Sequence, residues 1–198
     1  MITHLHGTVC AAGATWVDLD LQGLGFRVLC TPATAAGVRL GEATHLQTHL
    51  VVREDSQTLY GFATSEERDC FELCLGASGV GPKLALAIMS VLSPGELAAT
   101  VEAGDHKTLT RVPGIGPKGA QRIVLELKGK VIGFAGTGPA AVAAPVSEPW
   151  REQVSTGLQG LGWSTKDAEA ACDRVAPLAE TEDNVAVLMR AALQTLAK

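Results

Sequence analysis

Aromatic residues are scarce in this chain: phenylalanine, tryptophan and tyrosine make up 4% of its 198 residues, and there is one tyrosine. Because proteins that bind single strands of nucleic acid commonly stack the bases on aromatic side chains, this composition argues against such a role. No Walker A sequence is present, so we do not expect the chain itself to hydrolyse ATP. It also contains no targeting segment and no apolar run long enough to span a membrane, and we expect a soluble, cytoplasmic protein.

Cysteines are few and follow no pattern. The five of them are scattered, and none of their spacings is typical of a metal site. Cys70 and Cys74 lie one turn apart in an apolar helical stretch, and Cys172 stands alone near the end of the chain. We therefore expect reduced, buried thiols, with no metal ion and no cofactor.

The net charge of −5 is unevenly distributed along the chain. Residues 104–130 contain six basic side chains against two acidic ones, whereas residues 148–198 contain five basic and eight acidic ones. Binding of nucleic acid depends on local charge rather than on the total. The acidic total therefore does not exclude a nucleic-acid contact in the central part. The six basic residues there are Lys107, Arg111, Lys118, Arg122, Lys128 and Lys130.

A short segment occurs twice in the chain, 35 residues apart. Residues 78–88 read SGVGPKLALAI, and residues 113–123 read PGIGPKGAQRI. In each copy a Gly-hydrophobic-Gly turn leads into Pro-Lys and then into an apolar helical pattern. A short helix is expected before each turn, over 68–77 and 105–112. The two copies therefore indicate two helix-hairpin-helix units in tandem.

The chemistry of these turns favours phosphate as a ligand. Glycine at the turn positions allows positive φ and a close approach of the backbone to a ligand. The helix that follows presents unpaired N–H groups and the positive end of its dipole, and Pro82 and Pro117 remove no donor that the helix needs. Lys83 and Lys118 add charge at the same place. The four glycines are Gly79, Gly81, Gly114 and Gly116.

A tight helix–helix connection used only for packing is the simpler alternative for such a turn. Two copies in one register, each with a lysine at the helix start, favour it much less than a single copy would. The matched positions further along each helix follow helical spacing and are expected in the core. These matched positions are Ala85 and Ala120, Ile88 and Ile123, and Leu92 and Leu127.

The sequence pattern predicts a multidomain α+β protein with three folded parts. Residues 1–63 form five or six short alternating runs broken by glycine or proline, which predicts a small β-barrel, with an OB-like fold the natural candidate. Residues 64–133 turn helical and should contain about five helices, including both repeats. Residues 134–149, rich in glycine, alanine and proline, are expected to form a flexible linker. Residues 150–198 predict a UBA-like domain of three helices.

Capping residues predict where helices begin in the central part. Ser65 is the expected N-cap of its first helix, with Glu66 and Glu67 in the first turn. Ser93 and Glu96 are predicted to form a capping box.

The last fifty residues are expected to fold into three short helices, over 150–161, 166–176 and 181–197. Gly162 is the expected C-cap of the first, and Ser164 the expected N-cap of the second. A domain this small is marginally stable alone and is more often an adaptor than a catalyst. Three of its apolar residues could belong to the core or to an interface, with the core favoured: Leu161, Leu188 and Met189.

Several phrases of the sequence, in their order, resemble the RuvA family, the Holliday-junction-binding subunits of bacterial branch-migration complexes. They are VVREDSQTLYGF at 51–62, SGVGPKLALAI at 78–88, and VPGIGPKGAQRIVLELK at 112–128. The resemblance extends over the whole chain and implies an OB-like first domain, a double-hairpin second domain and a mobile third domain. It also implies a homotetramer, one or two of which clamp an open four-way junction.

The resemblance implies a function in recombination and DNA repair, including the SOS response. The chain would be a non-catalytic subunit that recognises four-way junctions and holds them open. Residues 150–198 would contact a hexameric ATPase motor of the RuvB type and so target it for branch migration. Whether a tetramer or an octamer is the working form stays open, as does docking of a RuvC-type resolvase.

The resemblance also assigns roles to individual residues. Backbone amides of the two turns would contact phosphates of the duplex, and the nearby cations would support them; such contacts carry little sequence information. Glu54 and Asp55 alone indicate an ordinary polar hairpin turn. In the family they fall on an acidic pin, whose negative charge repels phosphates near the junction centre. The implied DNA-binding residues are Gly79, Val80, Gly81, Lys83, Gly114, Ile115, Gly116, Lys118 and Arg122.

Three features depart from the family pattern. The first copy has Ala87 where the second has Arg122, and Pro117 fills a position that is often basic in relatives. His4 and His6, on one face of the first strand, stand where relatives often have arginine. Because histidine is mostly neutral at pH 7, we expect lower DNA affinity or a stronger dependence on salt and pH.

A DNA repair enzyme is the alternative function, because glycosylases and nucleases also use helix-hairpin-helix motifs. A glycosylase of the endonuclease III type would need a catalytic Asp or Lys soon after the hairpin, but here VLELKGKVIG follows. A metal-dependent nuclease would need clustered carboxylates, and the adjacent Glu54 and Asp55 are expected to point apart. A third alternative, a scaffold that uses the hairpins only for packing, would show no salt-dependent binding to DNA. We expect no catalytic residue in this chain.

Overall fold

The computed structural model describes residues 1–134, 149–179, 182 and 184–196. The linker expected over 134–149 lies almost wholly outside these residues, and so does the start of the helix expected over 181–197. The chain divides into two compact units, residues 1–141 and 142–198.

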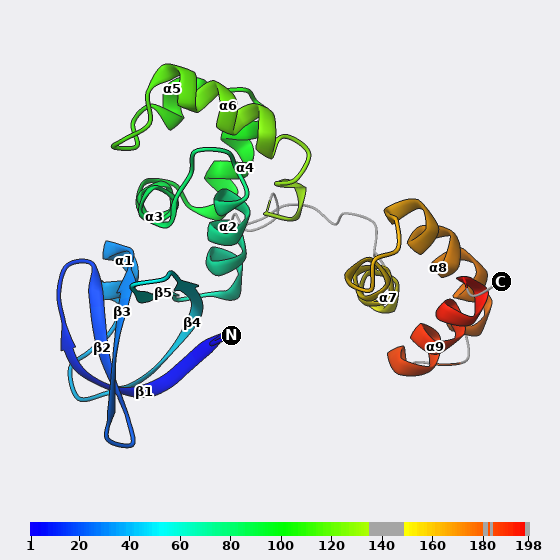
Figure 1. Cartoon of the computed structure of the whole chain (residues 1–198), viewed down its shortest axis with the longest axis horizontal. Coiled ribbons are helices and arrows are strands. Elements are labelled where there is room, and N and C mark those ends of the chain that lie inside the picture. The colour runs from blue at the N-terminus through cyan, green and yellow to red at the C-terminus, as the bar shows by residue number, and fades with distance from the viewer. Residues whose placement is uncertain (135–148, 180–181, 183, 197–198) are drawn as a thin grey trace. The chain divides into compact units, whose positions relative to one another are not determined.

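Five strands at the start of the chain close into a barrel (Figure 1), which confirms the predicted OB-like fold. Around the barrel the strands follow the order β1-β2-β3-β5-β4. All neighbours are antiparallel except β3 and β5, which run parallel and close the barrel. The strands are β1 (His4–Ala12), β2 (Trp16–Leu21), β3 (Leu24–Cys30), β4 (Ala43–Val52) and β5 (Gln57–Phe62).

Alternation along the strands fills the barrel. In β2, Val17 and Leu19 are fully buried, while Trp16 and Asp18 next to them are only half-buried. This two-residue period is the pattern from which the barrel was predicted. A short helix, α1 (Pro32–Ala36), follows β3 and was not predicted. Its signal is Thr31 before Pro32, because the Thr31 hydroxyl accepts the N–H of Thr34 at 3.2 Å.

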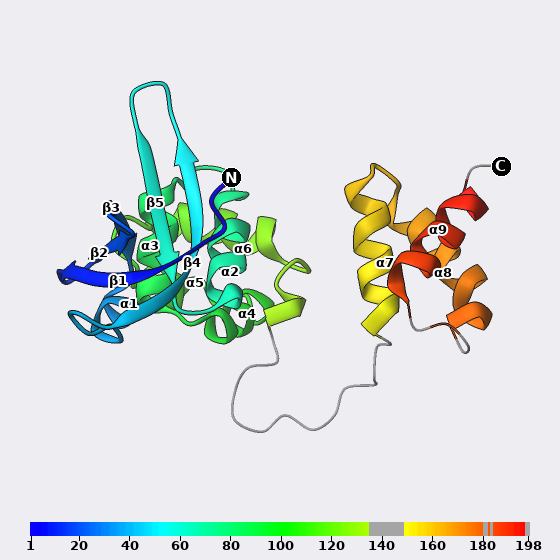
Figure 2. The same ribbon diagram turned by 90° about the horizontal axis from the view of Figure 1, so that it is seen from below.

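The hairpin of β4 and β5 extends past the other strands of the barrel (Figure 2). Its turn lies between Val52 and Gln57, and the Arg53 N–H donates to the Ser56 carbonyl at 2.8 Å. Glu54 and Asp55 therefore occupy the tip of a hairpin, as the sequence predicted.

Five α-helices follow the barrel in the same unit, the number expected between residues 64 and 133, and a single 3-10 turn, η1 (Ile132–Phe134), ends the series. Thr64, rather than Ser65, caps the first helix, because its side chain accepts the Glu67 N–H while the Glu67 carboxylate accepts the Thr64 N–H. The predicted capping box of Ser93 and Glu96 is confirmed. The helices are α2 (Ser65–Leu75), α3 (Pro82–Val91), α4 (Pro94–Glu102), α5 (His106–Leu109) and α6 (Pro117–Leu127).

These helices pack on strand β5. The ring of Phe71, on α2, lies 5.2 Å from the ring of Tyr60 and 5.0 Å from that of Phe62. Tyr60 and Phe62 belong to the hydrophobic cluster of the helices, whereas Leu59, on the same strand, belongs to the cluster inside the barrel. The six residues matched between the two repeats are all buried in the helical cluster, as predicted.

The cysteines follow the prediction with one exception. Cys30, Cys70, Cys74 and Cys172 are buried, and all five thiols are free. Cys10 is exposed, because its position on β1 faces outward, so the expectation that every thiol is buried was wrong.

No helix in the parts of the chain that the structure describes is by itself long and apolar enough to cross a membrane. The helices α3 and α4 pass that test of length and composition only as a pair, and the chain bends by 95° between them.

The second unit contains α7 (Pro149–Gly160), α8 (Thr165–Ala179) and α9 (Val185–Leu196), the three helices predicted. Gly162 has φ +99° between the first two, and the Ser164 hydroxyl accepts the Asp167 N–H at 3.2 Å. Leu188 is fully buried, but Leu161 is exposed, so its expected place in the core was wrong. The core of this unit consists of Val154, Leu158, Ala168, Ala171, Cys172, Val175, Leu188 and Ala192.

Candidate nucleic-acid interface

The two repeated turns have nearly the same backbone conformation. Gly79 and Gly114 have φ of +84° and +92°, in the left-handed region that favours glycine. Gly81 and Gly116 have φ of −90° and −87° with ψ of 172° in both. Of the four glycines expected to allow positive φ or a close approach of the backbone, the first of each turn therefore has positive φ and the second does not. An added Cβ at either position would have no other atom within 4 Å, so the backbone at these glycines faces open space.

Equivalent hydrogen bonds close the two turns. The Val80 N–H donates to the Ala77 carbonyl at 3.0 Å, and the Ile115 N–H donates to the Val112 carbonyl at 3.1 Å. The side chains of Val80 and Ile115 are buried in the helical core. These two residues thus anchor the turns, and their amide groups are engaged within the protein.

Each turn leads into a helix whose first N–H groups have no side-chain cap. Gly81 is the N-cap of α3 and Gly116 the N-cap of α6, and Pro82 and Pro117 follow at the first helical position. Because the first N–H groups of a helix lack partners within it, both turns offer donors at the positive end of a helix dipole. Such an arrangement suits an anion, and phosphate is the anion that DNA provides.

Exposed cations lie beside these donors. Lys118 is the second residue of α6, and Arg122 follows one turn later; both are exposed. Lys83, the second residue of α3, is exposed as well. Ala87, which corresponds to Arg122 in the first copy, is half-buried against the helical core. The second hairpin therefore carries two cations of its own, and the first carries one.

One carboxylate connects the two hairpins. Glu126, on α6, accepts the N–H of Ser78 at 2.7 Å, and Ser78 is the residue just before the first turn. This hydrogen bond holds the pKa of Glu126 below its usual value, and the charges of Arg122 and Lys130 act in the same direction. The bond ties the first turn to the helix that follows the second.

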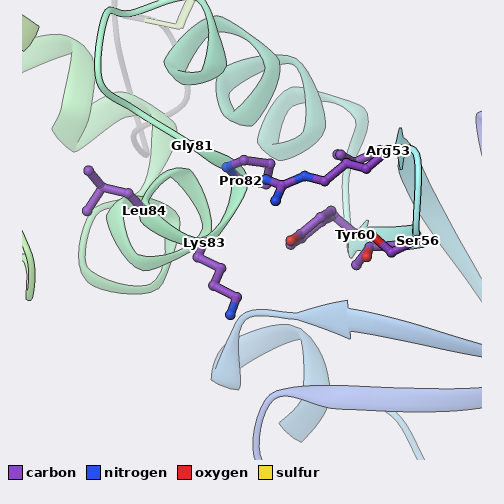
Figure 3. Close-up of a pocket in the computed structure, with 9 residues that line it drawn as sticks. Arg53, Ser56, Tyr60, Gly81, Pro82, Lys83 and Leu84 are labelled. Atoms are coloured by element: carbon purple, nitrogen blue, oxygen red, sulfur yellow. The ribbon is translucent and has the colours of Figure 1, made fainter.

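A cavity of about 480 Å³ separates the first turn from the β4–β5 hairpin (Figure 3). Arg53 extends from the hairpin toward Pro82, and the hydroxyl of Tyr60 points toward the start of α3. Burial raises the pKa of Tyr60, an effect that the positive charge of Arg53 partly offsets. Neither residue was singled out from the sequence, because their approach to α3 depends on how the barrel packs against the helices.

Glu54 and Asp55, at the tip of the hairpin, are exposed. The Ser56 hydroxyl donates to the Asp55 carboxylate at 3.1 Å. The structure therefore leaves both carboxylates accessible at the end of an extended hairpin. Among the residues described, no group of three or more His, Cys, Asp or Glu side chains could hold a metal ion.

Three histidines gather on the outer face of the barrel. His4 and His6 lie on β1, and His6 is paired with His45 on β4. The ring of His45 lies 5.2 Å from that of His4 and 6.3 Å from that of His6. The sequence identified the first two, but His45 could be found only from the register between the strands.

The chain has a closed five-stranded barrel followed by two hairpins, and the helix after each turn starts without a side-chain cap. This arrangement places the chain in the class of tandem helix-hairpin-helix proteins. Three family profiles match it: the RuvA N terminal domain over residues 1–61, the SAM-like helix-hairpin-helix tandem over 71–130, and the RuvA C-terminal domain over 149–197.

Whole-length relatives agree with these profiles. A protein of Cutibacterium acnes named Holliday junction branch migration complex subunit RuvA is 57% identical, over the full length of both chains. Proteins with the same name from Nocardioides sp. and Thermobifida fusca are 50% and 52% identical, again over both full lengths. The chain belongs to the RuvA family, as the sequence motifs predicted.

Proposed function

We propose that this chain is a non-catalytic DNA-binding subunit that recognises four-way junctions, holds them open and targets an ATPase motor of the RuvB type for branch migration. The names of its full-length relatives support this function. The observation that carries the proposal is the pair of hairpins with one backbone conformation, each with an uncapped helix start beside a lysine.

The hairpins would hold the duplex by its phosphates. Free N–H groups at the starts of α3 and α6 would donate to phosphate oxygens, with Lys83, Lys118 and Arg122 supplying charge. The open space at Gly81 and Gly116 lets the backbone of the DNA come close. Contacts to phosphate carry no sequence information, so the protein can hold any sequence that migrates past it.

The extended β4–β5 hairpin would act at the junction centre. In a homotetramer, four tips would place the exposed carboxylates of Glu54 and Asp55 around the crossover. Like charges repel, so these carboxylates would disfavour close approach of phosphates there and favour the open junction.

Residues 150–198 would form the motor-binding domain, separated by the 134–149 linker from the barrel (1–63) and the double-hairpin domain (64–133). A small three-helix unit with its own core suits an adaptor. Its exposed apolar side chains are candidates for the contact, since apolar surface that faces water favours an interface. These side chains are Leu161, Trp163, Leu178 and Val187.

Several further properties belong to the proposal. ATP hydrolysis would take place in the motor, and the chain would need neither a metal ion nor a cofactor. Five free cysteines suit a reducing compartment, and we place the protein in the cytoplasm. Deleting residues 150–198 should spare junction binding and abolish stimulation of the motor's ATPase activity.

A salt-dependent titration tests the central claim. The purified protein is titrated into an immobile four-way junction and into a linear duplex of equal length, over a range of salt concentrations. We expect tighter binding to the junction and a steep fall of affinity with salt for both substrates. Equal, weak binding to both would reject junction recognition, and salt-independent binding would reject the phosphate contacts.

The acidic tip has a test of its own. The double variant Glu54→Gln, Asp55→Asn removes both charges with little change of shape, and we expect it to bind the junction as tightly as the wild type or more tightly. Its preference for the junction over the duplex should fall. An unchanged preference, with unchanged branch migration, would remove the tip from the mechanism.

A further inference from the structure

The cavity between the β4–β5 hairpin and the start of α3 has the chemistry of an anion site (Figure 3). Its polar side chains come from two parts of the fold that are distant in sequence: Arg53, Ser56, Thr58 and Tyr60 from the hairpin, and Lys83 from α3. No carboxylate is among the described residues that line it. Guanidinium and ammonium groups donate hydrogen bonds and cannot accept them, so the cavity favours a ligand that accepts.

Tyr60 points to this ligand independently of the helix terminus. The residue is only 4% exposed, and its hydroxyl points toward the start of α3 (Figure 3). Within the described residues the hydroxyl has no hydrogen-bond partner. The hydroxyl opens onto the cavity, where it can donate a hydrogen bond to a bound ligand or accept one from it.

Arg53, an exposed residue of the same hairpin as Tyr60, also lacks a hydrogen-bond partner for its side chain. Its guanidinium forms neither a hydrogen bond nor an ion pair with any residue that the structure describes, although it is the residue next to Glu54. In Figure 3 it extends toward Pro82, at the start of α3. A guanidinium in this place can donate two parallel hydrogen bonds to one phosphate.

Comparison of the two repeats shows what Arg53 supplies. On α6, Arg122 lies one turn after Lys118, whereas on α3 the same position is Ala87. The first hairpin therefore lacks a cation that the second has. Arg53 borders the cavity at the first hairpin, so the barrel provides the charge that the repeat itself does not.

We propose that Arg53 and Tyr60, together with the start of α3, form a binding site for a phosphate of the DNA backbone, so that one phosphate is held by the barrel and the first hairpin at once. This inference rests on the proposed function. A volume of about 480 Å³ is more than a free phosphate ion needs, and it suits a phosphate with its attached sugars.

Such a shared phosphate would couple two functions of the molecule. Arg53 is adjacent to the acidic tip, and Lys83 is one of the cations that would hold the duplex by its phosphates. A phosphate held between them fixes the position of the tip relative to the duplex. Binding of a DNA arm would thereby place the carboxylates of Glu54 and Asp55.

Three variants of the full-length protein test the site: Arg53→Gln, Arg53→Lys and Tyr60→Phe. Arg39→Gln is the matched control, because Arg39 is an exposed arginine of the barrel that does not line the cavity. Each protein is titrated into a four-way junction at several salt concentrations. Ethylation interference then maps the phosphates whose modification blocks binding, and urea unfolding measures stability.

We expect Arg53→Gln to bind the junction about tenfold more weakly and to lower the salt slope by about 0.9 for each phosphate that the variant no longer neutralises. Interference at a specific subset of phosphates should also disappear. Arg53→Lys should recover most of the slope, because it keeps the charge. Tyr60→Phe should weaken binding less while unfolding at the same urea concentration as the wild type, and Arg39→Gln should behave as the wild type.

An Arg53→Gln protein with the wild-type slope and interference pattern would overturn the inference. In that case a Lys118→Gln, Arg122→Gln variant that still weakens binding leaves the proposed function standing. If the wild type shows no salt-dependent binding, the proposed function itself fails. Inorganic phosphate, added at constant ionic strength, distinguishes the two ligands. Stronger competition than chloride in the wild type but not in Arg53→Gln would show that the ion and the DNA share the cavity. Phosphate binding that depends on Arg53 but leaves junction binding unchanged would assign the cavity to the free ion and overturn the DNA assignment.

Discussion

The two hairpins share one backbone and differ in their surroundings. The φ values of their first glycines are +84° and +92°, and the turn hydrogen bonds are 3.0 and 3.1 Å long. The second hairpin has Arg122 on its own helix, whereas the first has Ala87 and lies beside Arg53 of the barrel. The two copies thus share the geometry that presents N–H donors and one lysine beside them, while the second cation comes from a different source in each copy.

This difference means that neither copy can be understood from its motif alone. The motif determines where a phosphate can approach, since it sets the turn and the free helix start. The strength of binding at each place depends on cations that the motif does not contain. Variants that change the two copies in parallel therefore separate the contribution of the backbone from that of the charge.

Removing the cations from each helix should produce the largest difference between the two hairpins, measured as the salt dependence of junction binding. Lys118→Gln with Arg122→Gln removes two charges from the second hairpin, and Lys83→Gln removes one from the first. With roughly one phosphate neutralised by each cation, the salt slope should fall by about 1.8 in the former and about 0.9 in the latter. Fluorescence anisotropy with a labelled junction measures both slopes. Lys166→Gln, in the second unit, is the control, and an unchanged slope in the double variant would contradict a phosphate role.

Gly81→Ala and Gly116→Ala should affect binding without harming the fold. Both positions have extended backbone and open space around the added methyl group, so the free energy of unfolding should stay the same or rise by about 0.4–1 kcal/mol. The methyl group would occupy the path of an approaching phosphate, and junction affinity should fall about tenfold in each variant.

Urea unfolding and a junction titration test these two variants together. Gly25→Ala, at another open position, should retain full affinity. Wild-type affinity in Gly116→Ala alone would mean that only the first hairpin contacts the DNA closely.

Gly79→Ala and Gly114→Ala should affect the fold instead. Both glycines have positive φ, +84° and +92°, which costs other residues about 1–2 kcal/mol. A Cβ at Gly114 would also lie 3.3 Å from Cδ1 of Leu84, whereas none of the surrounding atoms lies within 4 Å at Gly79. The loss of unfolding free energy should therefore be slightly greater for Gly114→Ala. Equal urea midpoints would show that Leu84 moves aside at no cost.

Glu126→Gln should have the smallest effect on stability, and this effect is best measured as a function of pH. The folded protein holds the pKa of Glu126 below its ordinary value of 4.5, so the carboxylate stabilises the fold above that pH. This contribution is lost as the pH falls through the lowered pKa, when the carboxylate takes up a proton. The difference in urea midpoint between wild type and variant should thus be greatest near neutral pH and vanish in acid. A difference that does not change with pH, or one matched by Glu152→Gln, would contradict this role.

Local patterns were sufficient to predict much of the fold and of the candidate interface. The barrel follows from alternation with a period of two residues, and the helices follow from apolar spacing and capping residues. Positive φ, however, occurs only at the first glycine of each turn. A Gly-x-Gly phrase does not reveal which glycine is strained and which only leaves space.

Features that depend on tertiary packing could not be predicted. Glu126 and Ser78 are 48 residues apart, and their hydrogen bond requires both repeats to be placed first. His45 joins the two histidines of β1 only through the strand register. The cap at Thr64 rather than Ser65 was a closer decision, because both residues can cap a helix. There the position of Glu67, three residues after Thr64, decides the outcome.

Strand β5 has a consequence for how the first unit comes apart. Leu59 contributes to the core of the barrel, and its neighbour Tyr60 and then Phe62 contribute to the core of the helices. Neither core can lose this strand without exposing apolar surface of the other. Barrel and helices should therefore melt in one cooperative transition despite their different architectures, and a duplex that stabilises the hairpins would raise the melting temperature of the barrel as well.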